Sequence, residues 1–112
     1  MTEQEINQYN HRQIALMESR IALYRNNQLS IKQFIDDTDA LIAWIKNPPS
    51  DWVRSLKGLL WEVEIIYAWA LDQKKDLTVG EFEQISQYVN KIEELVIWYK
   101  QNCILPLNNE EC

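Results

Sequence analysis

The stretch "SLKGLLWEVEIIYAWALD", residues 55–72, has more apolar residues than one face of a helix holds. At about 100° per residue it predicts a helix with two separate apolar stripes. The broader stripe is typical of the core side of a bundle helix and comprises Leu56, Leu59, Leu60, Val63, Ile66, Tyr67 and Ala70. The second stripe lies roughly opposite, between Glu62 and Glu64, and comprises Gly58, Trp61, Ile65, Ala68 and Trp69. A bundle helix buries only one face, so the second stripe is left without an assigned contact.

Apolar periodicity predicts three further helices, at about residues 3–26, 31–46 and 79–101, and no segment alternates like a strand. Pro48 and Pro49 end the second helix, and Ser50 or Asp51 is the expected N-cap of the third, which continues to about residue 73. The fourth helix follows a Thr78–Glu81 capping box. Its inward positions are Phe82, Ile85, Val89, Ile92, Val96 and Tyr99.

The joints between these helices are short, so each helix must fold back beside the one before it. The chain is therefore predicted to be an all-α, single-domain, antiparallel four-helix bundle with up-down-up-down topology. The bundle is expected to span residues 1–104, with a loose tail at 105–112 that follows Pro106.

Composition favours a compact, acidic domain. The chain has 112 residues, 46% of them hydrophobic, and a net charge of −6. Residues 57–112 contain 10 of the 17 acidic and 5 of the 11 basic residues, which places −5 of the charge in that half. Nucleic acid is not an expected partner, because phosphate binding needs a basic face. The absence of a long apolar run and the polar start "MTEQEINQYN" predict a cytoplasmic protein with no membrane partner.

The residues that usually carry catalysis are sparse. His11 is the single histidine and falls opposite the apolar stripe of its helix, where solvent is expected. Gly58 and Gly80 are isolated, so no phosphate loop is present in the sequence. Cys103 and Cys112, without a nearby histidine, fit neither a zinc site nor a disulfide framework. We expect no enzyme activity, no metal and no cofactor.

Arg20 is a polar residue inside the apolar arc of the first helix. An unpaired buried guanidinium is costly, so a carboxylate should meet it. Glu64 or Glu62 of the third helix is the expected partner, with Asp37 or Asp39 of the second helix as the next choice. The interpretation is a structural buried ion pair that fixes how the helices align.

The second stripe of residues 55–72 has two explanations. Either the third helix is central, covered by the first helix or by the "ILPL" segment, or the stripe is exposed and binds a partner. Trp61 and Trp69, two turns apart, are anchors of the kind found at binding hot spots. The outer face of the fourth helix is a second candidate and holds Glu83, Gln87, Asn90, Glu94 and Trp98. The joint around Asp76 and Glu81 adjoins it, and Trp44 is likewise off the main stripe of its helix.

Four segments in order, "RIALYRNNQLS", "ALIAWIKNPPSDW", "WEVEIIYAWALDQ" and "FEQISQYVNKIEELV", resemble small, acidic, all-helical immunity proteins. These proteins belong to bacterial polymorphic-toxin and contact-dependent growth inhibition systems. The resemblance covers roughly residues 14–97 and is most distinctive at Trp61-x-x-Glu64-x-x-Tyr67-Ala68. It implies a cytoplasmic antitoxin that binds the C-terminal domain of one cognate toxin, commonly a nuclease, and covers its active site.

Two other functions remain open. One is a homo-oligomeric helical adaptor or secretion chaperone in which the second stripe is a self-interface. The other is a small enzyme with a carboxylate site, which would need a bound metal. For the leading hypothesis, the free protein is expected to be a monomer whose acidic surface complements a basic nuclease cleft.

Overall fold

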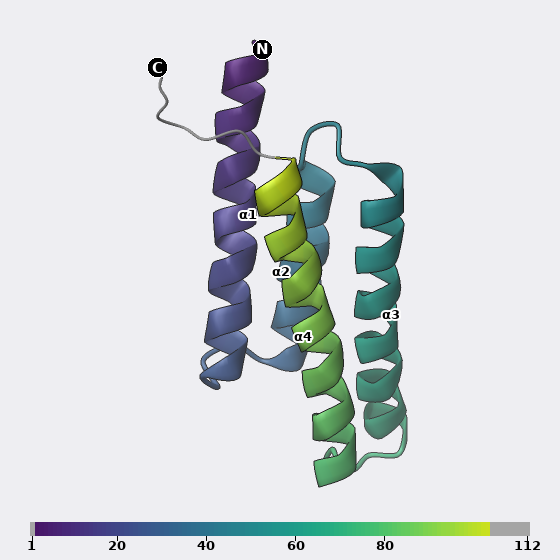
Figure 1. Cartoon of the computed structure of the whole chain (residues 1–112). Coiled ribbons are helices and arrows are strands. Elements are labelled where there is room, and N and C mark those ends of the chain that lie inside the picture. The colour runs from purple at the N-terminus through teal and green to yellow at the C-terminus, as the bar shows by residue number, and fades with distance from the viewer. Residues whose placement is uncertain (1, 104–112) are drawn as a thin grey trace.

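The helix boundaries lie close to the positions that the local sequence signals predict. The computed structural model describes residues 2–103, which form α1 (Glu3–Arg25), α2 (Ile31–Trp44), α3 (Ser50–Asp72) and α4 (Val79–Asn102). No strand occurs within these residues. The predicted all-helical four-helix bundle is confirmed (Figure 1). The predicted tail at 105–112 lies outside the described residues.

Side-chain caps begin three of the helices. The predicted box at α4 is present: the Thr78 hydroxyl accepts a hydrogen bond from the Glu81 amide at 3.1 Å, and Glu81 accepts one from the Thr78 amide at 2.8 Å. Thr2 and Glu5 make the same reciprocal contacts at α1, and Ser30 caps α2. Such contacts satisfy amides that have no partner inside the helix.

The boundaries of α2 and α3 differ slightly from prediction. The expected cap of α3 at Ser50 or Asp51 is wrong, because the N-cap is Pro49, which makes no side-chain cap bond. The second helix was predicted to reach residue 46 but ends at Trp44. Asn47 then adopts a positive φ of 53°, a conformation that asparagine tolerates better than most residues and that a helix cannot contain.

The helices pack around one core. α1 packs against α2 and α4, and α3 packs against the same two helices, so α1 and α3 lie diagonally across the bundle. In Figure 1 the chain descends along α1, ascends along α2, descends along α3 and ascends along α4. Fully buried side chains from all four helices meet inside, among them Ile14, Met17, Phe34, Leu56, Val63, Ile85, Ile92 and Val96.

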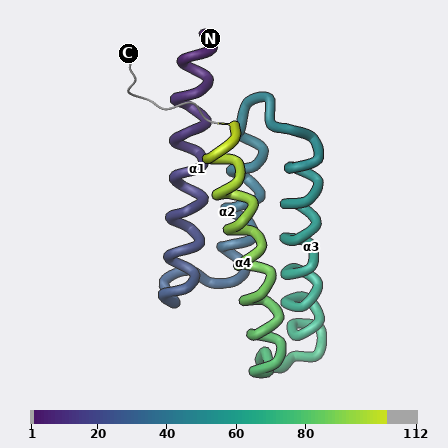
Figure 2. The backbone as a smooth tube through the Cα atoms, viewed as in Figure 1, coloured from purple at the N-terminus to yellow at the C-terminus, as the bar shows by residue number. Residues whose placement is uncertain are grey.

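The short second helix offsets the two helical hairpins. α2 has 14 residues, whereas α1 and α3 have 23 each and α4 has 24. At about 1.5 Å per residue, α2 is about 21 Å long and accompanies only part of α3, which is about 35 Å long. Figures 1 and 2 show the joined ends of α3 and α4 extending past the α1–α2 joint, while the start of α1 projects at the opposite end.

This offset explains an error in the sequence prediction. Phe82 was expected to point into the core, but its side chain is 49% exposed. The residue lies in the first turn of α4, beyond the level at which α1 ends. The other predicted inward positions of α4, from Ile85 to Tyr99, are buried.

Asn10 joins three parts of the chain and was not among the predicted core residues. Its side chain is buried; the amide oxygen accepts a hydrogen bond from the Lys46 backbone amide at 2.9 Å. The amide nitrogen donates to the Lys46 carbonyl at 2.9 Å and to the Tyr99 hydroxyl at 3.3 Å. Tyr99 in turn packs on Trp52, with ring centroids 4.6 Å apart. Asn10 thus fixes the α2–α3 joint against α1 and α4.

We predict that Asn10→Ala lowers the free energy of unfolding by about 2–3 kcal/mol, because it leaves both backbone groups of Lys46 without partners. Urea unfolding monitored by circular dichroism measures this loss. Gln8→Ala, a change at an exposed position of the same helix, is the control and should cost less than about 0.5 kcal/mol. Equal losses in the two variants would contradict a structural role for the Asn10 amide.

Gly58 has no packing reason to be glycine within the described chain. It lies in the middle of α3, and a Cβ atom built on it would meet nothing within 4 Å. Glycine in a helix interior costs roughly 0.5–1 kcal/mol relative to alanine. Gly58→Ala should therefore raise the free energy of urea unfolding by about that amount. A loss of stability would show that the backbone at this position is packed after all.

Candidate partner-binding surface

The second stripe of α3 is exposed. Each of its five residues, Gly58, Trp61, Ile65, Ala68 and Trp69, lies on the surface. The two tryptophans are 60% and 57% exposed. Of the two explanations open from the sequence, cover by the first helix is excluded, because α1 lies diagonally across the bundle from α3. The "ILPL" segment lies outside the described residues. An exposed apolar stripe is therefore a candidate for a partner-binding surface.

The predicted outer face of α4 is also on the surface. Its five residues, Glu83, Gln87, Asn90, Glu94 and Trp98, are exposed. The Asn90 side chain is held in place, since its amide oxygen Oδ1 accepts a hydrogen bond from the Arg25 guanidinium at 2.6 Å. Arg25 also pairs with Glu93 at 2.8 Å, which ties α4 to the end of α1. These contacts join α4 to the end of α1 at the surface, where the Arg25 and Glu93 side chains are 38% and 40% exposed.

The two residues predicted at the α3–α4 joint differ in their surroundings. Asp76 is exposed. Glu81 is partly buried, and its carboxylate is engaged in the α4 cap. The hydrogen bond from the Thr78 backbone amide lowers the pKa of Glu81 below its usual value. Glu81 thus has a capping role that the sequence also predicted.

A groove between α3 and α4 brings the two candidate faces together. It has a volume of about 620 Å³ and is lined by Ser55, Gly58, Leu59, Glu62, Lys91, Glu94, Leu95 and Trp98. Glu62 accepts a hydrogen bond from the Tyr88 hydroxyl at 3.3 Å, and the Lys91 ammonium lies 5.8 Å from the centre of the Tyr88 ring. The groove therefore offers a partner two carboxylates, an apolar floor and the 44% exposed Trp98.

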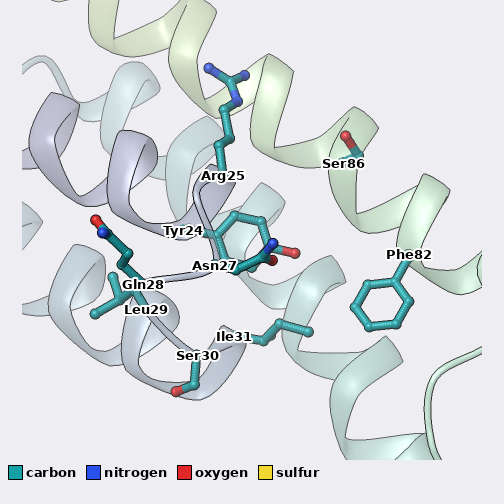
Figure 3. A pocket seen from close by; sticks show the side chains of 9 residues that line it. All are labelled: Tyr24, Arg25, Asn27, Gln28, Leu29, Ser30, Ile31, Phe82 and Ser86. Carbon is teal, nitrogen blue, oxygen red and sulfur yellow. The ribbon is translucent and has the colours of Figure 1, made fainter.

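A second hollow lies where the offset of the hairpins leaves α4 uncovered. Figure 3 shows it between the α1–α2 joint and the start of α4, with Ile31 and Phe82 on facing walls. Its volume is about 640 Å³. Phe82 also lines a hollow of about 390 Å³ beside Leu71 and Asp76 at the α3–α4 joint. The apolar period of α4 includes Phe82, but periodicity does not show how far the neighbouring helices extend, so the exposure of Phe82 has no signal in the sequence.

The Arg20 pair differs from its prediction. The first choice of partner, Glu64 or Glu62, is wrong, and the next choice, Asp37, is the partner. Arg20 Nε lies 3.2 Å from Asp37 Oδ2, while Glu64 is exposed on α3. Because α1 and α3 are diagonal, α2 supplies the nearest carboxylate. The pair is also less buried than expected, with side chains 34% and 30% exposed. It lines a hollow with Trp44, which is 61% exposed.

Arg20→Ala should therefore lower the free energy of unfolding by about 1–2 kcal/mol, between the range of exposed pairs and that of buried pairs. Glu64→Ala tests the predicted pairing of Arg20 with Glu64 and should lower the free energy of unfolding by less than about 0.5 kcal/mol. Urea unfolding of both variants and of Asp37→Ala measures the three losses. A loss in Glu64→Ala as large as that in Asp37→Ala would contradict the pairing with Asp37.

Within the described residues 2–103, His11 and Cys103 are the one histidine and the one cysteine. His11 is partly buried, whereas the sequence predicted that it lies in solvent. The Cys103 thiol is also partly buried, and this burial raises its pKa. No group of three or more His, Cys, Asp or Glu side chains within this range is placed to hold a metal ion. None of the four helices has the length and apolar character needed to cross a membrane.

No protein-family model matches the chain, and comparisons with curated proteins and with solved structures also found no match.

Proposed function

We propose that this protein is a cytoplasmic immunity protein that binds and neutralises one cognate toxin domain, most simply a nuclease with a basic substrate cleft. The observation that carries the proposal is the acidic groove between α3 and α4, where Glu62 and Glu94 flank an apolar floor beside the exposed Trp98. Inhibition is stoichiometric and needs no chemistry from the inhibitor.

The charge of the groove and of the adjoining α4 face suits a basic partner. Glu83 and Glu94 point to solvent from one helix face, and Lys91 is the one cation among the residues that line the groove. Opposite charge accelerates encounter between proteins and disfavours incorrect partners. A nuclease cleft that attracts phosphate would attract these carboxylates in the same way.

Rigid support and an aromatic anchor favour stable binding. The candidate residues are on two long helices packed on a common core, and α4 is further held by the Arg25 contacts to Asn90 and Glu93. A helix surface loses little conformational freedom on association. Trp98 adds a large side chain of the type that dominates binding energy in protein interfaces.

The test uses the C-terminal domain encoded by the reading frame adjacent to this protein's gene. Co-expression should abolish the toxicity of that domain, and the two purified proteins should form an equimolar complex. Reversal of Glu83 and Glu94 to Lys should slow association, most strongly at low salt where charge steering is least screened. Trp98→Ala should instead raise the dissociation rate by about tenfold, as loss of a desolvated anchor does. Stopped-flow kinetics at two salt concentrations gives both rates.

The matched control reverses Asp36 and Asp39, two exposed carboxylates of α2, the helix diagonal to α4. It changes the net charge by the same amount on the opposite side of the molecule. Equal slowing by both double reversals would assign the effect to overall charge and reject the α4 face. Failure of the unaltered protein to relieve toxicity or to bind the domain would reject the immunity function itself.

A further inference from the structure

The outer surface of α3 contains a second pattern, which shares only Gly58 with the residues that line the toxin-binding groove. Six exposed residues follow one another at spacings of four, three, four, three and four, and we call them the outer seam: Arg54, Gly58, Trp61, Ile65, Ala68 and Asp72. Alternating spacings of three and four are those of the contact positions in a coiled coil. α3 therefore has one face packed in its own core and a second face in solvent whose spacing matches that of packed helices.

The outer seam is nearly symmetrical about its middle, with a charge at each end, a small residue inside each charge, and large apolar residues at the centre. The two end charges are opposite in sign. If a second α3 runs antiparallel, Arg54 faces Asp72 of the second copy, Gly58 faces Ala68, and Trp61 faces Ile65. A parallel arrangement would instead place like charges together at both ends, which is unfavourable.

We propose that the outer seam is the interface of a homodimer in which α3 packs antiparallel on α3 of a second copy. The charges on the seam select this occupant, because one surface supplies both members of each ion pair. The Arg54 guanidinium is available for the pair: its contact with Asp51 at 3.1 Å joins two side chains that are 78% and 91% exposed, so that contact is weak.

The small residues of the seam support close approach of the two helices. Gly58 has open space where its side chain would be, and nothing in the described chain accounts for a glycine there. Trp69 borders the seam on the same flank as Gly58 and is 57% exposed. In the antiparallel pair the Trp69 ring of one copy covers Gly58 of the other. Glu62, on that flank, is turned toward Tyr88 of α4 by its hydrogen bond.

The size of the seam sets the expected strength of the dimer. From residue 54 to residue 72 the helix is about 27 Å long. Stable interfaces bury about 800 Å² on each partner, and a single helix pair is at the low end of that class. The dimer should therefore dissociate on dilution through the micromolar range. The proposal differs from the sequence prediction, which was that the free protein is a monomer. In the dimer, Glu83 and Asn90 on α4 remain exposed to solvent.

Sedimentation velocity of the purified full chain, from low to high micromolar concentration, tests the dimer without any toxin. The unaltered protein should pass from monomer to dimer across this range. Ala68→Glu places a long charged side chain at a small seam position and should keep the protein monomeric. Ala15→Glu makes the same change at an exposed position of α1 and should sediment as the unaltered protein does. Thermal melts of all variants verify that each is folded.

A charge swap tests the orientation of the two helices. Arg54→Asp alone, or Asp72→Arg alone, opposes like charges at both ends of the seam and should raise the dissociation constant by about tenfold. The double variant restores opposite charges in the antiparallel pair and should return the constant to within about threefold of the original. Each new charge also suits the dipole at its end of the helix, so the swap does not weaken α3 itself.

Three results would overturn the proposal. The first is that the unaltered protein stays monomeric at every concentration. The second is that Ala68→Glu weakens the dimer no more than Ala15→Glu does. The third is that the double charge variant has a dissociation constant as high as that of the single variants. Toxin neutralisation does not enter these measurements. Failure of the dimer therefore leaves the proposed immunity function standing, and failure of that function leaves the dimer standing.

Discussion

The contact between the Asn10 side chain and the backbone of Lys46 fixes the geometry from which the rest of the structure follows. The Asn10 side-chain amide accepts a hydrogen bond from the Lys46 backbone N–H and donates one to the Lys46 carbonyl, each at 2.9 Å. The α2–α3 joint is thereby held beside Asn10, the eighth residue of α1. Because α2 has only 14 residues, the far end of α3 extends beyond the α1–α2 joint (Figure 1).

The offset has a cost and a consequence. The end of α3 and the start of α4 have neighbours on fewer sides, and Leu71 and Phe82, which lie there, are 58% and 49% exposed. A fully aligned bundle would cover more of this apolar surface and gain roughly 25 cal/mol for each Å² removed from water. These residues stay on the surface instead, where they are candidates for contact with another protein.

The two proposed interfaces divide this surface between them. The outer seam of α3 is apolar at its centre and charged with opposite signs at its ends, which suits a second copy. The groove and the α4 face have an excess of carboxylates, which suits a basic partner and would repel another copy of an acidic chain. A dimer built on α3 would leave Glu83 and Asn90 of both α4 faces open but would cover Gly58 in the groove, so a toxin that fills the groove would compete with self-association.

The sequence by itself determined most of what depends on residues a few positions apart, although the N-cap of α3 and the last two residues predicted for α2 differ from the structure. The four helices, the Thr78–Glu81 cap, the end of α2 before Pro48 and the two stripes of α3 all follow from local contacts and helical periodicity. The surface position of Trp61, Glu83 and Trp98 was also among the alternatives that periodicity allows.

Only the tertiary structure decided how the helices are offset and which of them are diagonal. The offset depends on Asn10 and Lys46, 36 positions apart, and no local pattern encodes such a contact. The diagonal placement of α1 and α3 gave Arg20 an Asp37 partner in place of Glu64, and the offset exposed Phe82 although it follows the apolar period. Periodicity states which side of a helix is apolar; what covers that side depends on how far each neighbouring helix extends.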